Sequence, residues 1–127
     1  DIAARWQVFR INGPLFFAAA DRIFGELSTQ LADRRGIVVS MEGVTILDAG
    51  GLAALRKFID HCGKTGVKLV LTDFEFQPLK ALARSGFKPD GVCTFTFPTL
   101  DDALRHPLLA APDDGAADGT AIAAAQR

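Results

Sequence analysis

The sequence predicts an α/β fold in which a mixed β-sheet is covered by about four helices. Short runs rich in β-branched residues, typical of buried strands, alternate with longer segments whose apolar residues recur every three or four positions, as on one face of a helix. In addition, an Asn-Gly pair separates the first two apolar runs, which is the strongest short signal of a β-hairpin. A hairpin followed by alternating strands and helices predicts both antiparallel and parallel neighbours in one sheet.

The composition is that of an ordinary soluble domain. The chain has 127 residues, of which 49% are hydrophobic and 23% charged, so one domain with a substantial core is expected. A formal net charge of −1 argues against a nucleic-acid partner. Cys62 and Cys93 lie in apolar runs without metal-ligand spacing, and we interpret them as buried thiols. Because the chain opens at Asp1 without a methionine, we interpret it as a piece of a longer protein.

The N-terminal third is predicted to form a hairpin and a helix. Residues 6–11 form the first strand candidate, and Asn12 and Gly13 follow at the position of a type I′ turn. Residues 14–17 are then predicted to return as a short second strand. From residue 18 the apolar residues follow helical spacing, so the first helix is expected there.

The central stretch, residues 37–62, contains the turn to which the functional argument returns. Its first part is a β-branched apolar run, which predicts a buried strand, and from Leu52 the apolar residues follow helical spacing. Asp48 stands at the N-cap position, where its carboxylate can accept the free N–H groups of the first helical turn. Between Asp48 and Leu52 lie only Ala49, Gly50 and Gly51.

The C-terminal part predicts two more strands, two short helices and a tail. Residues 67–72 and 93–97 are the strand candidates, and a helix is predicted between them, starting at Pro78. A last short helix begins at Leu100. Beyond Leu109 the chain is mostly alanine, aspartate and glycine, so we expect a domain over residues 1–109 and a disordered tail over 110–127.

Few residues could carry catalysis. His61 and His106 have no cysteine or second histidine at ligand spacing, and Asp48 is the one carboxylate at a strand end where α/β folds bind ligands. An anion at the following helix N-terminus would gain roughly 0.3–1 kcal/mol from the helix dipole but lose up to roughly 4 kcal/mol to Asp48. Gly50 and Gly51 do not form a P-loop, because no Gly-Lys-Ser/Thr follows.

We therefore expect no enzyme activity, no metal and no cofactor, with weak nucleotide binding at the turn left open. An Asp48-dependent nucleotide hydrolase is the less favoured alternative, since it would need a metal.

A second candidate surface precedes and includes the third predicted helix. Lys80, Arg84 and Lys88 recur every four residues and form a basic ridge if the helix extends that far. Phe74 and Phe76 precede this ridge in a predicted loop, either as core residues or as an exposed hydrophobic contact. The ridge is a candidate contact for an acidic protein surface or for a membrane surface.

Three motifs together resemble STAS domains. The turn Leu-Asp-Ala-Gly-Gly-Leu, residues 47–52, follows a β-branched strand and is similar to the STAS signature. The stretch Gly-Pro-Leu-Phe-Phe-Ala-Ala-Ala, residues 13–20, resembles the corresponding stretch of STAS domains at the C-terminus of SulP-type anion transporters, except that Ala19 replaces the usual asparagine. Residues 74–79 further resemble the bacterial branch that includes dicarboxylate carriers.

The resemblance implies a function and a partner. It implies a cytoplasmic regulatory or interaction domain at the inner membrane, attached to the transmembrane domain of the same polypeptide and able to contact a cytosolic regulatory protein. The turn formed by Asp48, Ala49, Gly50 and Gly51 would meet the ligand or partner. The regulatory branch of the family, the anti-sigma factor antagonists, has a phosphorylatable serine where this chain has Gly50. A free-standing antagonist-like regulator that is not phosphorylated is the alternative interpretation.

Overall fold

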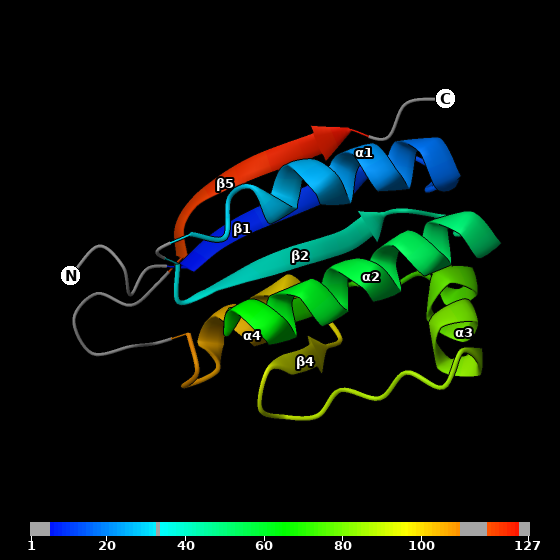
Figure 1. The fold of residues 1–127 in the computed structure, drawn as a ribbon. Helices are drawn as coiled ribbons and strands as arrows, with labels where there is room; N and C mark the ends of the chain where they lie inside the picture. The colour runs from blue at the N-terminus through cyan, green and yellow to red at the C-terminus, as the bar shows by residue number, and fades with distance from the viewer. Residues whose placement is uncertain (1–5, 33, 110–116, 125–127) are drawn as a thin grey trace.

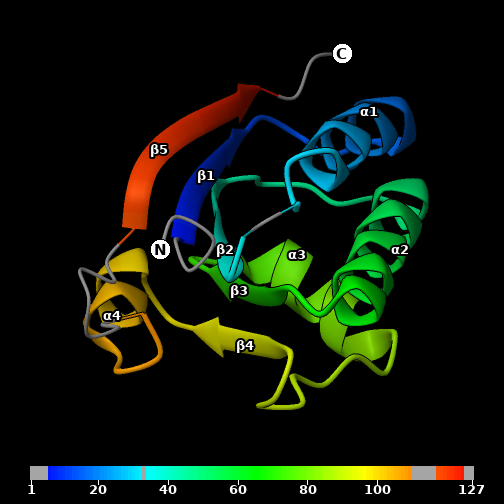
Figure 2. The same cartoon turned by 60° about the vertical axis from the view of Figure 1, so that its left-hand side comes forward.

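The computed structural model describes residues 6–32, 34–109 and 117–124, and in this part a five-stranded sheet carries helices on both faces (Figures 1 and 2). The elements in chain order are β1 (Trp6–Asn12), α1 (Phe17–Ser28), β2 (Gly36–Gly43), α2 (Ala49–Thr65), β3 (Lys68–Thr72), α3 (Phe76–Arg84), β4 (Thr94–Phe97), α4 (Leu100–Arg105) and β5 (Ala117–Ala124). The predicted α/β class and its four helices are confirmed for the described residues.

The strand order is β4-β3-β2-β1-β5, and each neighbouring pair is parallel. The register places Val38 of β2 between Val8 of β1 and Val70 of β3. Because all these strands run in the same direction, their carboxyl ends lie together at one end of the sheet. The N-termini of α1, α2 and α3 lie at that same end (Figure 1).

The predicted N-terminal hairpin is wrong, and so is the antiparallel pairing that it implied. Gly13 adopts a positive φ of 97°, as a turn residue would, but the turn leads from β1 into α1. Parallel strands, β2 and β5, pair with β1 along both of its edges, so neither edge is free for a returning strand. Leu15, placed in that predicted strand, forms instead an isolated parallel bridge with Leu47.

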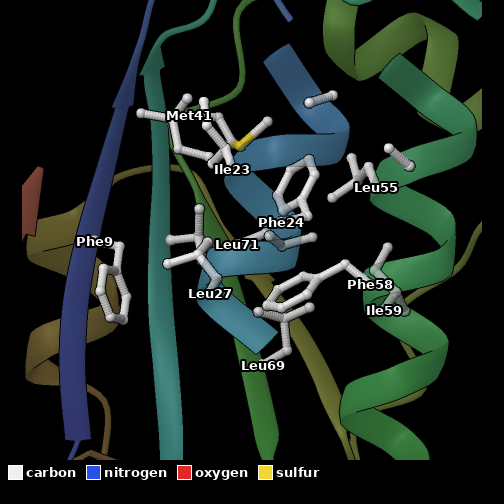
Figure 3. Packing of buried hydrophobic residues seen from close by; sticks show 14 of the residues in the cluster. Phe9, Ile23, Phe24, Leu27, Met41, Leu55, Phe58, Ile59, Leu69 and Leu71 are labelled. Carbon is white, nitrogen blue, oxygen red and sulfur yellow. The ribbon is translucent and has the colours of Figure 1, made fainter. Parts of the chain in front are cut away.

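The main core lies between the sheet and the pair α1 and α2 (Figure 3). Strands β2 and β3 are buried along most of their length, as expected of parallel strands covered on both faces. Their alternate residues point to opposite faces, so Val39 and Leu71 join this core. The rings of Phe24 on α1 and Phe58 on α2 stack with centroids 5.2 Å apart, which joins the two helices.

A smaller core covers the opposite face of the sheet, on the side of α4 (Figure 2). Here Trp6, Val38 and Val70 pack with Ala103 of α4 and with Leu109. The carboxylate of Asp73 holds α4 at its start, because it accepts hydrogen bonds from the Leu100 N–H at 2.9 Å and from the Thr72 hydroxyl at 2.6 Å. Asp73 has a φ of 61°, and this left-handed conformation turns the chain sharply after β3.

The tail differs from the expectation over part of its length. Residues 117–124 form β5 and pair with β1, whereas residues 110–116 and 125–127 lie outside the described residues. The sequence of β5, Ala-Asp-Gly-Thr-Ala-Ile-Ala-Ala, has low β-propensity, so the free backbone groups along the edge of β1 are the physical reason for its pairing.

Truncation after Leu109 tests the predicted domain boundary. We expect the shortened chain to unfold cooperatively with a melting temperature lower by about 5 °C or less, because the removed residues offer one large apolar residue, Ile122. Circular dichroism of the full chain and of the truncated chain measures the difference. A non-cooperative transition, or a loss larger than about 5 °C, would show that the tail docks on the domain and that the predicted boundary is wrong.

Candidate functional site

The predicted turn lies between β2 and α2, at the carboxyl end of the sheet. Asp48 has an extended backbone, and its Oδ1 accepts a hydrogen bond from the Gly51 N–H at 2.7 Å. The Asp48 carbonyl oxygen accepts the first helical hydrogen bond, from the Leu52 N–H at 2.8 Å. The predicted N-cap is therefore confirmed, and the exposed carboxylate neutralises part of the positive end of α2.

The connection from β1 to α1 runs directly beside this turn. The Leu15 N–H donates to the Ile46 carbonyl oxygen at 2.8 Å, and the Asp48 N–H donates to the Leu15 carbonyl oxygen at 3.4 Å. The Leu15 side chain is fully buried in the main core. Two strand-to-helix connections are thus joined through their backbones, which fixes the start of α1 against the start of α2.

The two glycines of the turn make this close approach feasible. A Cβ atom at Gly51 would collide with the Leu15 carbonyl oxygen, and one at Gly50 would lie 2.5 Å from the Phe17 Cβ. Neither glycine has a positive φ, so the requirement is space and not backbone conformation. The sequence indicated a tight turn here, but it gave no sign that α1 would be the crowding neighbour.

Gln77 connects the turn to α3, a contact that the sequence analysis missed. Its Oε1 accepts a hydrogen bond from the Leu47 N–H at 2.8 Å, and its Nε2 donates to the Leu47 carbonyl oxygen at 3.1 Å. A side-chain amide can satisfy one backbone donor and one backbone acceptor in this way. The first turn of α3 is thereby held beside the first turn of α2.

The space between these two helix starts is a groove of about 540 Å³, which we call the turn groove. Its lining residues are Leu47, Asp48, Ala49, Leu52, Phe76, Gln77, Lys80, Ala81 and Arg84. Asp48 lies on the α2 side, and Lys80 and Arg84 lie on the α3 side. The structure therefore brings two of the four predicted turn residues, Asp48 and Ala49, and two of the three ridge cations to one concave surface, whereas Gly50 and Gly51 do not line it.

The predicted basic ridge is shorter than expected. Helix α3 ends at Arg84, and the chain turns at Gly86, whose φ is +88°. Lys88 lies beyond this turn and lines a different surface depression, beside Phe87 and Asp90. A helix cannot continue through a residue in the left-handed region, so the ridge consists of Lys80 and Arg84 alone.

The two phenylalanines before the ridge have different roles. Phe74 is partly buried and packs against the main core, whereas Phe76 is 76% exposed. The Lys80 ammonium lies 5.4 Å from the centre of the Phe76 ring, a cation–π contact that holds both side chains at the rim of the groove. Phe16, Phe17 and Ile46 are also exposed at this end of the molecule.

The remaining ionisable groups of note serve structure. Burial raises the pKa of the Cys62 thiol to about 12, so this residue stays an unreactive thiol in the core. Cys93 is only half-buried. Backbone N–H groups of Thr94, Val92 and Cys93 lower the pKa of the Asp90 carboxyl to about 2, and this carboxylate organises the loop before β4.

Two kinds of feature are absent from the described residues. Histidine, cysteine and acidic side chains do not gather there in groups of three or more that could hold a metal ion. No helix in that part of the chain has the length and apolar character needed to cross a bilayer.

Comparison with known proteins agrees with the fold and the motifs. The STAS domain family model matches residues 3–103. A sulfate transporter family protein from Wolinella succinogenes, whose crystal structure is known, is 32% identical, with a TM-score of 0.65 over 78% of this chain and 81% of the other. The STAS domain of a SulP transporter from Vibrio cholerae shares the fold, with a TM-score of 0.61, 20% identity, and coverage of 78% and 77%.

The human protein solute carrier family 26 member 9 is 33% identical over 70 residues. That match covers 54% of this chain but only 9% of the human protein, so the chain corresponds to a small part of this relative. The chain belongs to the STAS domain family, among the STAS domains of SulP-type transporters.

Alanine substitutions of three glycines in α2 test the crowding at the turn. We expect Gly51→Ala to lower the free energy of unfolding by about 1–3 kcal/mol, because the new methyl group would displace the Leu15 backbone. Gly50→Ala should also destabilise the domain, because the new methyl group would lie 2.5 Å from the Phe17 Cβ, which moves only with the backbone at the start of α1.

Gly63→Ala is the matched control, because a Cβ there meets nothing within 4 Å, and we expect it to stabilise the domain by up to about 1 kcal/mol. Urea unfolding of the three variants gives the comparison. Equal effects of Gly51→Ala and Gly63→Ala would contradict the packing shown by the structure.

The contact between Gln77 and Leu47 leads to a separate prediction. Gln77→Ala removes both hydrogen bonds to Leu47 and should lower the free energy of unfolding by about 1–2 kcal/mol. Amide hydrogen exchange should increase most at Leu47, whose N–H loses its acceptor. Lys80→Ala, three residues further along the same helix, is the control and should leave the exchange of Leu47 unchanged.

Proposed function

We propose that this chain is the cytoplasmic regulatory domain of a SulP-type anion transporter and that it acts by binding partners, not by catalysis. The observation that carries the proposal is the 32% identity to the Wolinella succinogenes sulfate transporter family protein across 81% of that chain. The domain would be attached to the transmembrane part of the same polypeptide and would lie on the inner, cytoplasmic side of the membrane. Transport itself would belong to that transmembrane part.

The chemistry of the turn supports binding over catalysis. Asp48 is the acidic residue at the strand end, and its carboxylate is already used to cap α2. Its Oδ1 is engaged by the Gly51 N–H, and among the described residues the groove beside it is lined by no histidine, cysteine or second acidic side chain that could share an acid–base role. The exposed apolar residues beside it, Phe16, Phe17, Ile46 and Phe76, are instead typical of a protein contact.

Packing also argues against regulation by phosphorylation at this turn. Gly50 occupies the position of the serine in the antagonist branch, and a side chain there would meet Phe17. Both the missing hydroxyl and the missing space support a domain that is switched by partner contacts. Thr45 is exposed, but it precedes the turn and does not lie on α2.

The parent protein provides the test. We expect the sequence upstream of Asp1 in the gene to encode several apolar segments of about 20 residues, and removal of residues 1–109 to reduce uptake of a labelled inorganic or dicarboxylate anion. Uptake must be compared at equal membrane abundance, with Gly63→Ala as a folded control. Absence of membrane segments would favour the free-standing regulator.

Phosphate mapped by mass spectrometry to residues 45–52 after incubation with an anti-sigma kinase and ATP would contradict regulation by partner contacts alone.

A further inference from the structure

We infer that the turn groove binds a short acidic segment of a separate cytosolic protein, with an apolar side chain of that segment inserted between α2 and α3. This inference rests on the proposed function, because it names the chemistry of a partner for the same turn. It follows from the shape of the groove, from the excess of its two cations over its one lining acid and from the rigidity of its walls.

The shape of the groove suits a peptide side chain. Leu52, Phe76 and Ala81 provide apolar surface between the two helices, and the volume of about 540 Å³ lies in the range of small-molecule and side-chain pockets. Gln77 fixes the two walls relative to each other through its two hydrogen bonds to Leu47. A partner therefore meets a site that is already formed, which reduces the entropy lost on binding.

The charge of the groove selects an acidic segment. Among the described residues, neither Lys80 nor Arg84 makes an ion pair, and both are exposed. The one lining acid, Asp48, already accepts a hydrogen bond at the positive end of α2. Glu42 and Glu75 lie at the same end of the molecule but outside the groove lining, and Glu42 faces Arg10 at 4.0 Å.

The same features argue against two other occupants. A bilayer is broad and flat, and two cations inside a groove are fewer than the roughly four to eight clustered lysines and arginines that typically bind anionic headgroups. The cytoplasmic loops of membrane proteins are rich in lysine and arginine, so the transmembrane part of a transporter would offer Lys80 and Arg84 charges of the wrong sign. An acidic segment thus points to a second, soluble protein.

Two synthetic peptides of about 12 residues test the inference, with leucines at identical helical positions and either glutamate or lysine around them. Binding to the 127-residue chain is measured by fluorescence anisotropy at low ionic strength. We expect the glutamate peptide to bind, with amide shifts in the NMR spectrum at Ala49, Leu52 and Phe76. The double variant Lys80→Glu with Arg84→Glu should weaken it at least about tenfold and should improve binding of the lysine peptide.

The matched control is Lys57→Glu with Lys64→Glu, which changes the net charge equally on a different exposed surface of α2. It should alter the affinity less than about twofold. Melting curves establish that both double variants are folded. The variant Lys80→Gln with Arg84→Gln removes the two positive charges without reversing them, and it should weaken binding of the glutamate peptide less than the double glutamate variant does. An equal loss in the control, no binding of the glutamate peptide, or preferential binding of the chain to vesicles containing phosphatidylserine would overturn the inference.

The two proposals fail separately. A parent gene with membrane segments and a transporter that depends on this domain would uphold the proposed function even if neither peptide binds. Conversely, selective binding of the glutamate peptide to a chain without membrane segments would leave the groove assignment standing and would point to a free-standing regulator.

Discussion

The close approach of the β1–α1 connection to the first turn of α2 determines how this end of the molecule is built. Backbone hydrogen bonds join Leu15 to Ile46 and Asp48, and they leave no space for side chains at Gly50 and Gly51. Because the two connections share hydrogen bonds, α1 and α2 start from one fixed point and pack together along the same face of the sheet (Figure 3). A change in the backbone of the turn would therefore shift the start of both helices.

Helix α3 extends this fixed point into a surface. Its first turn bonds to Leu47 through Gln77, so three helix starts are held together at the carboxyl end of the parallel strands. Ligands bind at this end in α/β folds because the connections there differ from protein to protein while the strands beneath them stay rigid. Here the connections supply exposed apolar side chains and α3 supplies two cations, which suits a protein contact better than a reaction.

How much the sequence could predict depends on whether a signal is local. The cap at Asp48, the period of α2 and the buried strands are local features, and they were predicted correctly. The direction of the chain after Gly13 depends on which strands occupy the edges of β1, which is a remote property, so the Asn-Gly signal was misleading. The contact between Gln77 and Leu47 spans 30 residues and has no sequence pattern. Gly86 lies just beyond the end of α3, but the four-residue spacing of the cations suggested that the ridge continued past it.

The crowding at Gly50 also bears on how such a domain can be switched. In a turn with a serine, a phosphoryl group would add charge at the helix start and change the contact surface by chemistry. In this chain the position faces Phe17, which makes the turn a fixed joint between α1 and α2. Under the proposed function, such a joint would not respond by local rearrangement, and a signal would instead arrive as the binding energy of a partner that favours one placement of the whole domain. The proposed partner would then contact exposed side chains around the turn, including Phe76 and Lys80, and not the turn backbone itself.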